Sequence, residues 1–196
     1  MAAVDLGGPI KGLPGITYLD AIKLVAPGAG QDGRSPWDDG KVAGQSPLRH
    51  ISGDAADAQD APAEIGQGVV SVQRVQSGGR QRLLLLLDLG SVPDSAEGYA
   101  VLVLIDPGAT PPRLLDAANV GYDRLTGFFT PGALRVGQGE DVALIASSHF
   151  NSNQSYRTVA MIGLRGDKLR LIDTVFTLGD TACGYRRTQT PRFTAR

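Results

Sequence analysis

The sequence predicts a mainly β protein: an antiparallel sheet or sandwich of two related four-stranded meanders, each resembling a propeller blade, with one short N-terminal helix. Two observations support this fold class. From Val69 onward, short apolar runs alternate with turn residues, as expected for strands. The same order of runs and turns also occurs twice between residues 66 and 180.

Composition is compatible with one folded domain. The chain has 196 residues, of which 42% are hydrophobic and 20% are charged, so a core can form. The formal net charge of −1 supplies no basic field, which argues against nucleic acid as a partner. Unbroken apolar runs such as Leu83–Leu87 are far shorter than the roughly 20 residues of a membrane span.

Residues 1–65 form an irregular lead-in rich in Gly, Pro, Asp and Ala, with one predicted helix at about 17–26. Thr17 can cap this helix and Asp20 completes a capping box, while Pro27 ends it. One apolar face contains Tyr18, Leu19, Ile22 and Val25. A helix this short is marginal alone, so we expect it to pack on the β domain.

The β domain is expected at 66–182, divided into units 66–122 and 123–180. The first unit contains the strands "VVSVQRVQ", "RQRLLLLLDLG", "GYAVLVLID" and "RLLDAANVG". The second contains "ALRV", "VALIASS", "YRTVAMIGL" and "LRLIDTVFTLG". Before them, "PLRHISG" is expected to add a brief edge strand, and residues 183–196 form a tail or a further edge strand.

The two units align without gaps when one is shifted by 57 residues. The shift places Tyr99 on Tyr156 and Asp116 on Asp173, and "RLLD" on "RLID". Two blade-like units cannot close a ring, so they must pack face to face, join at an edge or oligomerise.

The five consecutive leucines of Leu83–Leu87 predict a central strand. An antiparallel strand with one solvated face would alternate polar and apolar residues. We therefore expect one face of this strand to pack on the other unit and the second face to be covered by the N-terminal helix.

The segment "SSHFNSNQSY", Ser147–Tyr156, is the strongest candidate site. In the 57-residue register it falls on "GSVPDSAEGY", so it is expected to be a ten-residue connector that gained a histidine and amides in one copy. Amides offer both donors and acceptors, which suits a carbohydrate or protein ligand, although a purely structural role uses the same chemistry. The candidate ligand-binding residues are His149, Asn151, Asn153, Gln154 and Tyr156.

Catalytic candidates are weaker: His149, Asp173 and Ser148. Ser148 and His149 are adjacent and so point to opposite faces of a strand. A hydrolase would need a distant serine, with Asp173 or Asp88 orienting His149. No G-x-S-x-G motif is present. Asp116 and Asp173 are related by the repeat and could face each other as a glycosidase pair, or form ordinary strand-end contacts.

No cofactor or metal site is predicted. The single cysteine, Cys183, excludes an internal disulfide and a cysteine-based zinc site. The acidic loop Trp37–Lys41 lacks the spacing of a calcium loop. The N-terminus does not have the pattern of a signal peptide, and the β-rich, cysteine-poor composition slightly favours an exported, periplasmic protein over a cytoplasmic one.

The sequence favours a non-enzymatic binding or interaction module, for example of the bacterial cell envelope. The alternatives are a hydrolase that uses His149 with a carboxylate, and a structural subunit completed by a protein partner. Self-association is compatible with all three.

Overall fold

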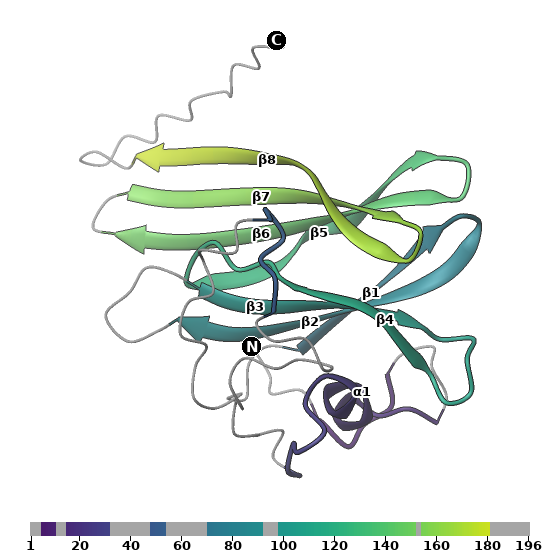
Figure 1. The fold of residues 1–196 in the computed structure, drawn as a ribbon. Coiled ribbons are helices and arrows are strands. Elements are labelled where there is room, and N and C mark those ends of the chain that lie inside the picture. Colours follow the sequence, from purple (N-terminus) through teal and green to yellow (C-terminus); the bar gives the residue numbers. More distant parts are fainter. Residues whose placement is uncertain are drawn as a thin grey trace.

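A computed structural model describes residues 5–10, 15–31, 48–53, 70–91, 98–151 and 154–180. Within these ranges the chain forms one helix and two four-stranded antiparallel sheets. Figure 1 shows three layers, with the helix on one side of the first sheet and the second sheet on the other. The predicted fold class is confirmed.

Sheet 1 is the meander β1-β2-β3-β4. Its strands are β1 (Val70–Ser77), β2 (Arg80–Ser91), β3 (Gly98–Asp106) and β4 (Arg113–Asn119). The chain just before it adds an edge to β4, because Asn119 bonds through its backbone to Arg49 and Ile51. The brief edge strand expected in "PLRHISG" is therefore present as a bridge between His50 and Asn119.

Sheet 2 is the meander β5-β6-β7-β8. Its strands are β5 (Leu125–Gly137), β6 (Glu140–Asn151), β7 (Gln154–Arg165) and β8 (Lys168–Asp180). Strand β5 begins earlier than the predicted "ALRV". An irregularity between Phe128 and Ala133 interrupts its pairing with β6, and "TPG" in this stretch hid the first half of the strand from a pattern analysis.

Helix α1 (Tyr18–Val25) has the predicted capping box. The backbone N of Asp20 donates to Thr17 Oγ1 at 3.1 Å, and the backbone N of Thr17 donates to the Asp20 carboxylate at 2.9 Å. The buried residues Leu19 and Ile22 then pack against sheet 1, as expected. Lone helices of this length are unstable, so the packing holds the helix in place.

The leucine run is covered on both sides, as predicted. Leu83, Leu85 and Leu87 belong to the cluster that contains α1. Leu84 and Leu86 belong to the cluster shared with sheet 2. Hereafter the inner face of each sheet is the one turned toward the other sheet, and the outer face is the one turned away.

The internal repeat is present, and one detail supports the predicted register. The β3–β4 ladder shifts between Leu104 and Ile105, and the β7–β8 ladder shifts between Met161 and Ile162, 57 residues later in both positions. The predicted alignment without gaps was wrong, however. Leu84 pairs with Leu104, while Leu144 pairs with Met161, so the second copy is three residues shorter between these strands.

Candidate functional site

The segment Ser147–Tyr156 is a β-hairpin rather than a ten-residue connector. Strand β6 continues to Asn151 and β7 begins at Gln154, with Ser148 paired to Arg157 and His149 to Tyr156. The prediction was wrong because hydroxyl and amide residues, which favour turns, here occupy a long regular ladder. Side chains along the segment therefore alternate between the two faces of sheet 2.

The inner face of this hairpin presents a row of rings. His149 stacks on Tyr156, with centroids 4.6 Å apart and planes 16° from parallel. The ring of Tyr156 lies 6.3 Å from that of Phe176 on β8. Phe176 and its neighbour Leu178 are 60% and 48% exposed, so the row ends in open apolar surface. We call His149, Tyr156, Phe176 and Leu178 the aromatic row.

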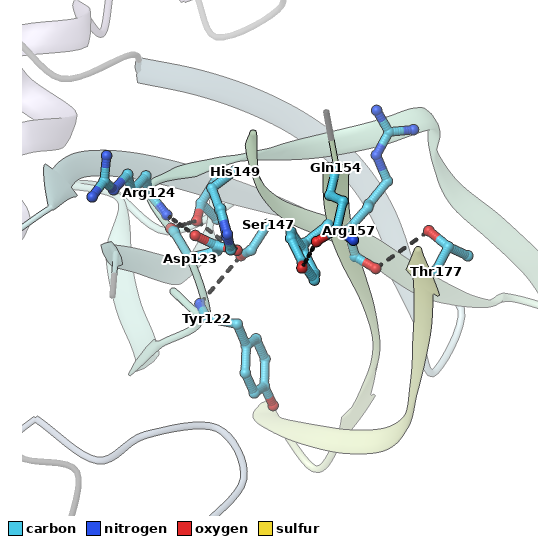
Figure 2. A network of polar contacts seen from close by, with 10 residues as sticks. Tyr122, Asp123, Arg124, Ser147, His149, Gln154, Arg157 and Thr177 are labelled. Atoms are coloured by element: carbon cyan, nitrogen blue, oxygen red, sulfur yellow. Dashed lines mark hydrogen bonds and ion pairs between the residues drawn. The ribbon is translucent and has the colours of Figure 1, made fainter. Parts of the chain in front are cut away.

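His149 is held by a carboxylate that the sequence analysis did not select. Its Nδ1 contacts Oδ2 of Asp123, and Oδ1 of Asp123 accepts from the backbone N of Arg124 at 2.7 Å. Figure 2 shows the two side chains turned toward each other. Asp123 fixes the ring through Nδ1, and Nε2 of His149 has no partner among the described residues.

The link between the sheets places Asp123. Residues 120–124 cross closely over the start of β3, and a Cβ built on Gly98 would lie 1.7 Å from the carbonyl oxygen of Asp123. A Cβ on Gly121 would likewise meet Gly98 at 2.4 Å. Only glycine permits this crossing at both positions. No local pattern marks Asp123 as a partner of His149, because they come together only through this crossing.

Ser147 has a structural role. It is 1% exposed, and its Oγ accepts from the backbone N of Tyr122 at 3.2 Å and shares a hydrogen bond with Thr126 at 2.9 Å. Thr126 also donates its backbone N to Asp88 at 3.2 Å. These contacts attach the start of β5 to both sheets. Ser147 thus serves as an anchor for the link rather than as a nucleophile.

Asp173 does not orient His149, and Asp116 and Asp173 form ordinary strand contacts, the alternative to a glycosidase pair. Asp173 pairs with Met161 and lies on the outer face of sheet 2, on the opposite side from His149, so it cannot orient that ring. Asp173 and Asp116 also do not face each other. Asp116 is buried at the β4–β8 edge, where it accepts from Leu169 N at 2.9 Å, Arg49 at 2.7 Å and Lys168 at 3.3 Å.

The remaining candidate site residues lie on different faces or outside the described residues. Ser148 lies on the outer face, opposite to His149, as predicted from their adjacency. Gln154 Oε1 accepts the hydroxyl of Tyr156 and so steadies the row. Asn153, the side chain of Asn151, Cys183 and the loop Trp37–Lys41 lie outside the described residues. Within the described ranges, no group of three or more His, Cys, Asp or Glu side chains could hold a metal ion.

A hollow of about 990 Å³ lies at the other end of β6, among the β1–β2, β5–β6 and β7–β8 turns. Arg82 in its wall is buried and paired with Asp106 and Asp167. Arg80, Arg165 and Arg170 also line the hollow. It is remote from His149 and shares no lining residue with the aromatic row.

No helix in the described ranges is both long and apolar enough to cross a membrane. No protein-family model matches this chain, and neither a curated protein nor a solved structure is similar enough to suggest a family. Functional assignment therefore depends on the geometry of the β6–β7 hairpin and its surroundings.

Proposed function

We propose that this chain is a binding module that receives its ligand on the aromatic row. The supporting observation is the combination of a fixed His149–Tyr156 stack with exposed Phe176 and Leu178 on one face. Burying a large side chain contributes about 1.5–3 kcal/mol, so Phe176 left in water is a costly arrangement that a ligand would relieve.

The chemistry of the row defines the ligand class. The rings and the aliphatic side chain of the row suit a ligand with a flat apolar surface. The neighbouring Gln154 and Nε2 of His149 can form hydrogen bonds with polar groups at the edge of that ligand. A sugar ring and an apolar segment of a peptide both have this character. If the chain is instead a structural subunit completed by a protein partner, an apolar segment of that partner would bind on the same surface.

The test is a binding screen of the full chain against arrayed oligosaccharides and arrayed peptides. We expect binding on one array, and a loss of about tenfold or more when Phe176→Ser removes an anchor ring. Phe129→Ser is the control, because Phe129 is also exposed but lies on β5, outside the row. Equal loss in both variants, or no binding on either array, would refute the proposal.

The second candidate is a hydrolase in which Asp123 orients His149 and Nε2 of His149 removes a proton from water. The Nδ1 contact to Asp123 favours it, since this is how a carboxylate sets the tautomer of a general base. A panel of esters and glycosides separates the two candidates. Turnover that falls about a hundredfold or more in His149→Ala and is also reduced in Asp123→Asn would support the hydrolase and reject the non-enzymatic module.

A further inference from the structure

The outer face of sheet 2 is apolar across its width. Its centre holds Leu144, Ala146, Val159, Met161 and Val175, which neighbour one another across the ladders. Toward its ends lie the large exposed residues Leu125, Leu134, Phe150 and Ile172, which are 65%, 45%, 66% and 59% exposed. A run of exposed apolar side chains on one sheet face is typical of an interaction surface.

The equivalent face of the first repeat copy packs against another sheet. Leu84 pairs with Leu104, and Leu86 with Leu102, on the inner face of sheet 1. Their equivalents Leu144, Met161, Ala146 and Val159 lie on the outer face of sheet 2. The two sheets thus stack face to back. In sheet 1 this face is fully buried against a second sheet, whereas in sheet 2 Leu144 is buried but Ala146, Val159 and Met161 are only partly buried, and all four lie outside both described core clusters.

The two equivalent aspartates make the same contrast. Asp116 lies at the ladder shift in sheet 1 and accepts the backbone N of Leu169 from the neighbouring sheet. Asp173 lies at the matching shift in sheet 2. It is exposed, and among the described residues it accepts only from the backbone N of the next residue, Thr174. The aspartate that contacts a neighbouring sheet in the first copy has no such contact among the described residues in the second copy.

We propose that two copies of this chain associate through the outer faces of sheet 2, around a two-fold axis. Apart from the aromatic row, the other apolar sheet faces in the described chain are covered: the outer face of sheet 1 by α1, and the inner faces by each other. A second copy offers the same outer face, and a patch that packs on itself has two-fold symmetry.

The area is sufficient. The four strands have 12 or 13 residues each. At about 3.3 Å per residue and about 4.8 Å between strands, the face measures roughly 800 Å². A standard stable interface takes about 800 Å² from each partner.

The charges on the face suit the same symmetry. Arg157 and Asp173 both lie on it, and neither forms an ion pair with a described residue. Val159 is level with Ala146 and Val175 across the sheet, midway along the strand between Arg157 and Met161, the partner of Asp173. An axis across the strands at Val159 would bring Arg157 of each copy to the level of the partner's Asp173.

Sedimentation equilibrium of the full chain over a wide concentration range tests the proposal. We expect a monomer–dimer equilibrium that Phe150→Asp or Ile172→Asp weakens by about tenfold or more, because each buries a charge in an apolar contact. Phe176→Asp, at an equally exposed position outside this face, should leave the dimer intact. Circular dichroism confirms that each variant is folded.

A charge exchange tests the register. Arg157→Asp and Asp173→Arg each create two like-charge contacts in the dimer, and each should weaken association by about tenfold or more. The double variant restores both pairs with reversed signs and should recover most of the affinity. A wild-type chain that stays monomeric throughout, a dimer sensitive to Phe176→Asp but not to the face variants, or a double variant as weak as the single ones would overturn the proposal.

Discussion

The buried carboxylate of Asp116 on β4 hydrogen-bonds to the backbone of β8 and should contribute strongly to the stability of the contact between the two sheets. Replacing Asp116 tests this contribution. It accepts the backbone N of Leu169, a fully buried residue, at 2.9 Å. It also pairs with Arg49 and Lys168, whose side chains are 36% and 51% exposed. In Asp116→Ala, water can rehydrate the two cations, but the buried N–H loses its acceptor.

The expected cost follows from these contacts. An unsatisfied buried N–H costs about 1–3 kcal/mol. The two partly exposed ion pairs add about 0–1 kcal/mol each. Asp116→Ala should therefore lower the free energy of unfolding by about 1–5 kcal/mol. Asp116→Asn keeps an acceptor for Leu169 and should lose less.

Urea unfolding followed by circular dichroism measures this difference. Asp173→Ala is the matched control, because Asp173 is the repeat equivalent and is exposed on the outer face. At concentrations where the chain is monomeric, that control should lie within about 0.5 kcal/mol of wild type. Equal losses in both variants, or a loss below about 0.5 kcal/mol in Asp116→Ala, would refute this contribution of Asp116.

Three other outcomes follow from the fold. Thr17→Ala removes the cap of α1 and should cost about 0.5–2 kcal/mol in thermal or urea unfolding, while Thr17→Ser keeps the cap; equal losses would contradict this. Burial raises the pKa of Tyr99 to about 12, so its neutral form is favoured in the folded state. The stability that Tyr99 contributes should be complete below about pH 10 and lost as pH rises toward about 12, and this part of the alkaline unfolding curve should be absent in Tyr99→Phe. Deleting residues 1–26 uncovers the outer face of sheet 1 and should cause aggregation in light scattering; a soluble, equally stable truncation would show that α1 does not protect that face.

Local rules predicted α1 because capping and helical spacing act within a few residues. They also predicted most strands and the repeat, because apolar runs and turn residues are read along the chain. The same rules misjudged the β6–β7 hairpin. Residues such as Ser147 and Asn151 have turn propensities that a long ladder overrides, and no sequence pattern shows where a ladder ends.

The candidate site was half predictable. His149 and Gln154 were selected because the other repeat copy lacks them, and Tyr156 as an aromatic residue beside them; the three do lie together on one face. Asp123 and Phe176 were missed. Asp123 is brought to His149 by the chain crossing at Gly98 and Gly121, and Phe176 reaches Tyr156 through the β7–β8 register.

By itself the sequence determined that this chain makes strands in two matching sets, and that the leucine run needs cover on both faces. Those properties depend on side-chain size, polarity and local spacing. Only the tertiary structure decided that the sets stack face to back, that Asp116 is buried while its equivalent Asp173 is exposed, and that the apolar outer face of sheet 2 lies outside the core clusters of the described residues. Such outcomes depend on which distant surfaces meet, and identical local patterns can have different neighbours.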